Sequence, residues 1–551
     1  MTIWLKASVL ATLLAFGSVA ADEPAYDVVI RNGRLLDGSG NPWIRADVAI
    51  TGDKFVKIGR IERHGRREID ASGLYVSPGW IDMMDQSGEV LLKNGLAENK
   101  LREGVTSAIA GEGGTPVPSA RIAAYFQQLQ EQGISLNFGS YYGAAQARVE
   151  VMGDVAGKPS SVQMDKMKAH VEEAMRAGAM GIATALIYPP DAYQSTGDLI
   201  ELARVAAAHG GIYASHMRDE SAKLLDAINE SIEIGAESGI QVEIFHFKAA
   251  YAPGFGKLAP AAGKLIEDAR ARGVNIAADM YVYTAGGTGL DTTVPNWVWE
   301  KGKARGLRLL ADPKVRARLK KEVAAGSEVG WSNLVEASGG WDHVILANAF
   351  DPKLDRYRYK SMAFIGGELH RDPADIAWDI VLHGQPDHRP MALYFMMSEP
   401  DIETAVRWPW MSIGSDAGAN DGPGTMDAIG LPHPRSYGNF PRVIAEYVRK
   451  RPILTLEDAV RKMTSWPAAR MRLYNRGVIR EGLQADVTIF NYDTIQDTAT
   501  YENPQSYPTG IDYVLVNGQV VVDQGKHTGI KPGRVLRGAG FDVARAVVAP
   551  K

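Results

Sequence analysis

The chain has 551 residues, of which 45% are apolar and 23% are charged, and this ordinary globular composition excludes disordered and fibrous proteins. Its formal net charge of −5 offers no surplus of basic residues to a phosphate backbone, so we expect no nucleic-acid partner. The chain contains no cysteine, which excludes disulfides, thiol nucleophiles, zinc fingers and iron–sulfur clusters.

The first residues have the pattern of a secretory signal peptide. Lys6 precedes an apolar run at 7–16, and Ser18 and Ala20 form a small-x-small cleavage pattern. The run is shorter than the roughly 20 residues that a permanent membrane span needs, and no second apolar stretch is long enough. We expect cleavage after Ala20, no stable membrane insertion of the mature chain, and a periplasmic or secreted location. An uncleaved membrane anchor is the alternative.

Both ends of the mature chain are expected to build one small β-sandwich. Residues 26–75 alternate Val- and Ile-rich runs with Asn-Gly, Gly-Ser-Gly and Gly-Asp turns, which is typical of short strands. Residues 477–537 return to this pattern, with strands at 485–492 and 513–527 and an Asn-Gly hairpin in the second. Neither end alone has enough strands for an independent core, so a composite sandwich is the economical interpretation.

The middle of the chain, residues 76–470, alternates strand-like and helical runs, which indicates βα units and a mainly parallel sheet. Leu, Ile and Ala recur at helical spacing most clearly in 198–209 and 221–238. Eight strand segments between such runs predict a TIM-like (β/α)₈ barrel. These segments are 76–84, 105–111, 135–143, 181–187, 211–217, 242–248, 274–281 and 410–417.

Two further segments, 343–350 and 391–397, also have the composition of strands. They exceed the number that the barrel requires. The surplus predicts an insertion at about 291–365, which we interpret as a lid over the site.

Polar side chains lie at the ends of three predicted barrel strands. His216, His246 and Asp416 each follow an apolar strand core. The carboxyl ends of barrel strands converge on one face, where active sites are built. Two imidazoles and a carboxylate there can bind one metal ion, and imidazole nitrogen suits Zn²⁺. A packed core histidine is the alternative for either histidine alone, but two at matching strand ends favour a metal site.

Several long, ordered segments carry a family resemblance, among them IYASHMRDES, IFHFKAA, DMYVYTA, SDAGAN and LPHPRSYGNFPR. They resemble the N-acyl-D-amino-acid deacylases, or D-aminoacylases, of the amidohydrolase superfamily. The resemblance extends from about Tyr26 to Arg537. It implies a metal-dependent TIM-like barrel, a β-sandwich made from both termini, and hydrolysis of an amide beside a free carboxylate.

The resemblance also implies roles for single residues. His216 and His246 match the metal-binding histidines, and Asp416 matches the catalytic aspartate that ends the last barrel strand. The positions that match contacts to the substrate carboxylate are Lys248, Tyr283 and Arg435. The chemistry agrees, because two cations and a phenol at the mouth of a metal pocket can anchor an anionic substrate. A surface ion pair for the cations and a core position for the tyrosine are the alternatives.

The first barrel strand departs from the family pattern. Amidohydrolases usually have Asp-x-His-x-His there, but this chain has Met84 and Gln86 in place of the two histidines. The family cysteine after the next strand is also missing, and Glu112 lies at or one residue from its position. We expect Gln86 to hydrogen-bond the substrate or a ligand rather than to bind metal. For Asp82 we prefer capping or orienting the backbone over metal binding, and Asp85, a candidate polar group of the pocket, stays unassigned.

The missing histidines argue against a two-metal site. One ion held by Glu112, His216 and His246 is sufficient, because catalytic zinc commonly has two histidines, a carboxylate and water as ligands. We expect one Zn²⁺ per chain, although Mn²⁺, Co²⁺ and Fe²⁺ also suit such ligands. The metal would activate water, and Asp416 would act as general base and then general acid. A loop or helix-capping carboxylate is the alternative for Glu112.

These observations predict an exported, metal-dependent amidohydrolase that cleaves N-acyl (D-)amino acids or dipeptide-like amides with a free carboxylate. The D-configuration comes only from the family resemblance. A cyclic-amide or carbamoyl hydrolase and a catalytically inactive, ligand-binding relative are the alternatives. The expected partner is a small-molecule amide, and the sequence leaves open the acyl group, the amino-acid side chain and the oligomeric state.

Overall fold

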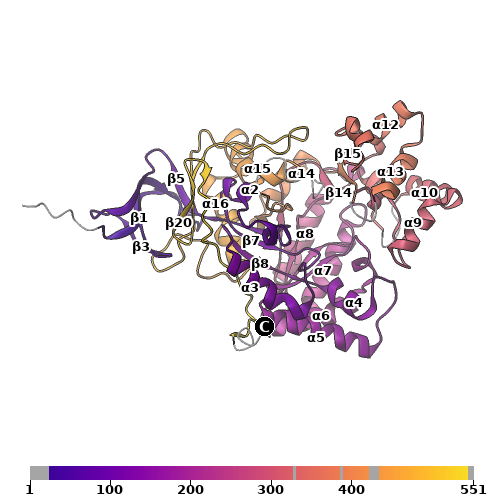
Figure 1. Cartoon of the computed structure of the whole chain (residues 1–551), viewed down its shortest axis with the longest axis horizontal. Helices are drawn as coiled ribbons and strands as arrows, with labels where there is room; N and C mark the ends of the chain where they lie inside the picture. Colours follow the sequence, from indigo (N-terminus) through magenta and orange to yellow (C-terminus); the bar gives the residue numbers. More distant parts are fainter. Residues whose placement is uncertain (1–23, 327–330, 385–388, 421–432, 544–551) are drawn as a thin grey trace, which may run out of the picture.

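The computed structural model describes residues 24–326, 331–384, 389–420 and 433–543. In Figure 1 the terminal strands lie at one end of the molecule, the barrel in the middle, and a separate group of helices and strands at the other end. The predicted signal peptide and its cleavage site lie outside the described residues. Within these ranges no helix is both long and apolar enough to cross a membrane.

Strands from both termini form one nine-stranded sheet. The amino-terminal strands are β1 (Tyr26–Leu35), β2 (Ile44–Thr51), β3 (Lys54–Gly59), β4 (Gly65–Asp70) and β5 (Tyr75–Pro78). The carboxy-terminal strands are β18 (Val487–Phe490), β19 (Ile511–Val516), β20 (Gln519–Asp523) and β21 (Lys526–His527). The two groups meet where β5 pairs with β18, with Ser77 opposite Thr488. Hydrogen bonds connect all these strands in a single sheet, so its division into two sandwich layers stays a prediction.

Each of the eight predicted barrel segments contains an observed strand. These are β6 (Trp80–Asp85), β7 (Val105–Ala110), β8 (Asn137–Ser140) with β9 (Tyr142–Gly143), β10 (Gly181–Ala185), β11 (Ile212–His216), β12 (Gln241–Ile244), β13 (Ile276–Met280) and β17 (Met411–Ile413). The strands are parallel, and the backbone N–H of Asp416 donates to the carbonyl of Met84 at 2.9 Å, which joins the last strand to the first.

Helices that follow the strands cover the barrel. They are α1 (Val90–Lys93), α2 (Glu98–Arg102), α3 (Ile122–Gln132), α4 (Ala144–Met152), α5 (Ser161–Ala177), α6 (Thr196–Ala208), α7 (Leu224–Ser238), α8 (Leu258–Ala271), α14 (Glu399–Val406), α15 (Arg435–Arg442), α16 (Leu456–Met463) and α17 (Ser465–Arg470). Helix α6 begins where the Ser195 hydroxyl accepts the N–H of Asp198, and it buries Leu199, Leu202 and Ala206. Helix α7 ends at Gly239, whose φ of 70° suits glycine.

Most of the chain between β13 and α14 forms an insertion with a second buried core. Its antiparallel sheet contains β14 (Gly286–Gly289), β15 (Val344–Asn348) and β16 (Met391–Tyr394). Its helices are α9 (Lys303–Ala311), α10 (Pro313–Ala325), α11 (Leu334–Ala337), α12 (Met362–Leu369) and α13 (Pro373–Gly384). The two surplus strand candidates are β15 and β16, so the insertion extends past both ends of the predicted 291–365.

A fully buried ionic cluster joins the first and last barrel strands. The ammonium of Lys100 lies 2.9 Å from Asp82, 3.0 Å from Asp85 and 2.6 Å from the Ser415 hydroxyl. Burial lowers the pKa of Lys100, but the neighbouring carboxylates of Asp82, Asp85 and Glu103 outweigh burial and raise it, so the ammonium stays charged. The cluster gives Asp82 and Asp85 a structural role, which the sequence left open for Asp85.

We expect Lys100→Met to lower the free energy of unfolding by about 3–5 kcal/mol, because it leaves two buried carboxylates without their cation. Urea unfolding monitored by circular dichroism measures the change. Lys93→Met is the matched control, since Lys93 and its partner Glu89 are both exposed and such pairs contribute about 0–1 kcal/mol. Equal effects of the two substitutions would contradict the expectation.

Candidate metal centre

The predicted site residues gather at the carboxyl end of the barrel strands. Gln86 directly follows β6, and Glu112 lies two residues after β7. His216 is the last residue of β11, and His246 and Asp416 follow β12 and β17. A cavity of about 390 Å³, here called the metal-site cavity, opens at this end. Four of these residues line it, the exception being His246, which lies buried behind His216 and Glu112.

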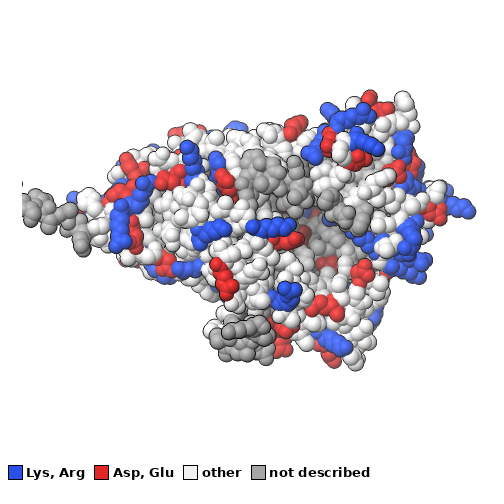
Figure 2. Space-filling model, in the orientation of Figure 1, with Lys and Arg blue, Asp and Glu red and all other residues white. Residues whose placement is uncertain are grey.

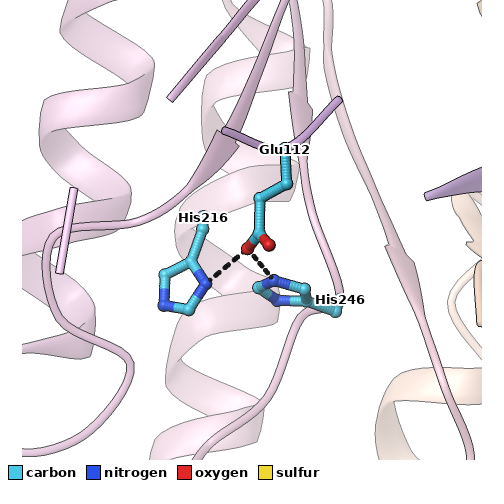
Figure 3. A group of neighbouring side chains, drawn as sticks. All are labelled: Glu112, His216 and His246. Atoms are coloured by element: carbon cyan, nitrogen blue, oxygen red, sulfur yellow. Dashed lines mark hydrogen bonds and ion pairs between the residues drawn. The ribbon is translucent and has the colours of Figure 1, made fainter. Parts of the chain in front are cut away.

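Glu112, His216 and His246 form the closest group. Oxygen Oε1 of Glu112 lies 2.7 Å from Nδ1 of His216 and 2.8 Å from Nε2 of His246. Figure 3 shows the carboxylate pointing between the two imidazole rings. One oxygen and two nitrogens all lie within 4.8 Å of one another, which is the spacing of donors around a single ion. Two imidazoles and one carboxylate are also the donor set that catalytic zinc prefers, so the residues fit one divalent cation.

Glu220 lies behind both histidines, and the sequence did not single it out. Its carboxylate is 3.1 Å from Nδ1 of His246 and 3.4 Å from Nε2 of His216, the nitrogens that face away from Glu112. Lys248 lies 2.8 Å from the same carboxylate. Carboxylates in this position fix the orientation of metal-binding imidazoles and increase their basicity. The only sequence signal is an acidic residue four positions after His216.

Ionisation in this group depends on close opposite charges. Burial raises the pKa of Glu112, but its hydrogen bonds to His216 and His246 outweigh burial and hold it well below its usual range. Burial and Lys248 lower the pKa of His246, whereas the carboxylates of Asp416, Glu220 and Glu112 together raise it to about 10. The raised pKa favours the imidazolium of His246 at neutral pH, and a metal ion bound by this ring would displace its proton.

We expect the metal affinity to increase with pH, by about tenfold per pH unit between pH 7 and 9 for one displaced proton. The sign follows from the raised pKa of His246, because a proton held up to pH 10 competes with the metal at every lower pH. Competition with a chelator of known pH dependence measures the affinity. A pH-independent affinity would contradict the imidazolium.

Asp416 and Gln86 connect the metal group to the opposite wall of the cavity. The side-chain amide of Gln86 donates to Glu112 at 2.7 Å and to Asp416 at 3.2 Å. Arg435 lies 2.8 Å from the other oxygen of Asp416. Gln86 thus contacts Glu112, which is a predicted metal ligand. Asp416 and His246 also have φ values of 49° and 34°, and such strained backbone is characteristic of residues held for function.

Arg435, Lys248 and Tyr281 lie together on one wall of the same cavity, here called the cationic wall. Each of its cations also has a carboxylate partner at 2.8 Å, Asp416 for Arg435 and Glu220 for Lys248. The ring of Tyr281 lies 4.6 Å from the Arg435 guanidinium and 5.6 Å from the Lys248 ammonium. The Nε of Arg435 is buried and has no hydrogen-bond partner within the described ranges. His433 fixes this arginine by accepting its backbone N–H at 3.0 Å.

Tyr283 does not line the metal-site cavity, in contrast to its predicted contact with substrate. Its hydroxyl donates to the carbonyl of Pro434 at 3.4 Å, and its ring packs 5.5 Å from that of His433. The chain leaves β13 at Met280, so the alternation of a strand no longer decides which tyrosine faces the site. The phenol in the cationic wall is Tyr281, and Tyr283 is a core aromatic.

Comparison with known proteins agrees with this geometry. Residues 67–522 match the model of the amidohydrolase family. A D-aminoacylase of Alcaligenes xylosoxydans xylosoxydans is 32% identical over 538 residues, which cover 94% of this chain and 98% of the relative. An N-acyl-D-glutamate deacylase of the same organism is 31% identical, with 93% and 96% covered.

Solved structures agree as well. A crystal structure of D-aminoacylase has a TM-score of 0.77 and 29% identity, covering 93% of this chain and all of the other. An N-acyl-D-glutamate deacylase from Bordetella bronchiseptica, solved with zinc and a phosphonate mimic of the tetrahedral intermediate, has the same TM-score and 28% identity, with 93% and 99% covered. The expectation of an enzyme of this class is thus confirmed: the chain belongs to the amidohydrolase family and is a hydrolase of C–N bonds.

Proposed function

We propose that this protein is a deacylase of N-acyl-D-amino acids that works with one divalent cation, zinc being the first choice. The observation that carries the proposal is the convergence of Glu112, His216 and His246 on one point within 4.8 Å. The relatives that match over nearly the whole chain are deacylases of D-amino acids, which supports the substrate class. A bound cation would lower the pKa of water and polarise the amide carbonyl.

The residues of the chain supply the other functions. The cationic wall of Arg435, Lys248 and Tyr281 binds the substrate carboxylate, because charge-assisted hydrogen bonds are the strongest that a side chain can offer. Asp416 accepts a proton from the attacking water and passes it to the departing amine. Gln86 holds Asp416 beside Glu112 by its two hydrogen bonds.

The test is hydrolysis of matched N-acetyl-D- and N-acetyl-L-amino acids by zinc-loaded protein, measured as release of free amine. We expect the D-enantiomers to be cleaved faster, and the corresponding D-amino acid amides, which lack the carboxylate, to react about 10–100-fold more slowly. Equal rates for acids and amides would contradict the carboxylate anchor. Cleavage of cyclic amides and of none of these substrates would contradict the proposal and favour a cyclic-amide hydrolase.

We also propose that the mature enzyme acts in the periplasm or outside the cell, on the basis of residues 1–20. Amino-terminal sequencing of protein from a periplasmic fraction should begin at Ala21. A mature chain that still begins at Met1 would contradict cleavage.

A further inference from the structure

A second cavity, larger than the metal-site cavity, lies between the barrel and the insertion. Its volume is about 500 Å³, and we call it the insertion cavity. Residues of the insertion such as Val294, Leu307 and Trp331 form one side, and Ile187 and Pro189, which follow β10, form the other. In Figure 2 the surface is hollowed between the barrel and the insertion.

The two cavities share a wall beside the metal group. Ile187, Tyr188 and Arg389 line both of them. The ring of Tyr188 lies 5.2 Å from that of His216, and Gly113, which follows Glu112, lines the insertion cavity. Only the side chains of this shared wall therefore separate the insertion cavity from Glu112 and His216.

The lining of the insertion cavity suits an apolar group. Its aromatic and aliphatic residues include Trp299, Leu307 and Trp331. The Asp291 carboxylate is paired with Arg389 at 2.9 Å, so these charges neutralise each other. Lys303 is exposed and leaves its charge in water. Two more carboxylates line the cavity: Asp154 is exposed to water, and Asp191 accepts hydrogen bonds from the backbone of Ala185 and the side chain of Gln194. With the charged groups paired, hydrogen-bonded or in water, the aromatic and aliphatic surface of a cavity of this volume suits a large organic group.

The geometry of the substrate decides which of its groups can enter the insertion cavity. In an N-acyl amino acid the carboxylate and the side chain branch from one carbon on the amine side of the amide. Of the metal-site and insertion cavities, only the metal-site cavity is lined by the cationic wall, so we place both branches there. The acyl substituent leaves the carbonyl in the opposite direction. An acetyl group would fill only a small part of a 500 Å³ cavity.

We infer that the insertion cavity is a subsite for a long aliphatic acyl chain, and that the preferred substrates are N-(fatty acyl) amino acids. The inference rests on the proposed deacylase function and names its substrate class. Burial of each added methylene raises kcat/KM by up to about fourfold. The basic helices α9 and α10, over which Lys and Arg gather in Figure 2, would also attract such anionic amphiphiles.

The test compares N-acetyl, N-hexanoyl, N-octanoyl and N-lauroyl derivatives of one D-amino acid with zinc-loaded protein. We expect kcat/KM for the octanoyl substrate to exceed that for the acetyl substrate by at least 100-fold. Hydrolysis at rates independent of chain length would overturn the inference and leave the proposed function standing. Preference for an aminoacyl group over a fatty acyl group of equal length would also overturn it, in favour of a peptide.

A pair of variants on one helix locates the effect. Leu307 and Leu309 are both half-buried on α9, but only Leu307 lines the insertion cavity. We expect Leu307→Arg to lower the octanoyl-to-acetyl ratio of kcat/KM at least tenfold, and Leu309→Arg to keep the wild-type ratio. Leu307→Trp, which fills the cavity without adding charge, should act like Leu307→Arg. Equal ratios in all three variants would overturn the assignment.

Calorimetry separates failure of the inference from failure of the proposed function. If no N-acyl amino acid is hydrolysed, the deacylase proposal fails. Binding of the same substrate series to the zinc-loaded protein then still tests whether the insertion cavity accepts the acyl chain. Affinity that rises with chain length in the wild type and not in Leu307→Trp would support an apolar subsite. Affinity that does not rise in the wild type would overturn it.

Discussion

Asparagine in place of Asp416 is expected to lower kcat by about 10²–10⁴-fold and to leave the metal content unchanged. The amide has the shape of the carboxylate and can still accept from Gln86, which now lies 3.2 Å from Asp416. It cannot take a proton from water. Because Asp416 is outside the group of three metal donors, metal binding should not depend on it. Saturation kinetics and elemental analysis of the same preparation measure both properties.

Asp219→Asn is the matched control for Asp416→Asn. Asp219 is also buried beside a barrel strand, but it accepts hydrogen bonds from Ser221 and does not line the metal-site cavity. We expect its kcat within a few-fold of the wild type. If Asp416→Asn instead lost the metal, Asp416 would be a ligand and not the base.

Alanine in place of Glu112 is expected to remove the metal. The wild type should bind about one ion per chain, because Glu112, His216 and His246 are the only such group within the described ranges. Loss of one protein ligand out of three should weaken metal binding by more than 10–100-fold. That range is typical when the residue removed contacts a ligand and not the metal itself. Activity should fall in parallel and return only partly with excess Zn²⁺. Chelator competition measures the affinity.

Two further variants calibrate this result. Glu220→Gln removes a carboxylate that contacts the histidines from behind, and we expect a 10–100-fold weaker affinity. Glu89→Ala removes an exposed carboxylate at the edge of the same cavity and should leave affinity unchanged. Two ions per chain in the wild type would contradict the single-ion site, as would full metal content in Glu112→Ala. One related D-aminoacylase is described with a binuclear metal centre. The number of metal ions per chain therefore distinguishes this protein from that relative.

Local patterns predicted most of the barrel, because a buried parallel strand must be apolar over its whole length and a helix must be periodic. The same patterns did not identify every sheet that a strand joins. Residues 343–350 fall within the predicted insertion, but 391–397 lie outside its predicted bounds and pair with them in the same small sheet. That choice depends on contacts between segments far apart in the chain, which composition does not record.

The strand-end argument found the metal group because geometry fixes where the ends of parallel strands meet. It reached His216 and His246 directly, and Glu112 through its place in the family motif. It did not find Glu220, which lies in a loop where no period relates position to direction. Tyr283 came from the family resemblance alone, and Tyr281 was not considered. Beyond Met280 the path of the chain and not strand alternation orients each side chain.

The pairing of β5 with β18 has a consequence for synthesis of the protein. Ser77 cannot pair with Thr488 until the ribosome has added Thr488, 411 residues later. At about 5–20 residues per second, the amino-terminal strands spend tens of seconds without half of their sheet. Their unpaired edge is then open to chaperones. The sheet of a nascent chain thus stays incomplete until its final segment is made.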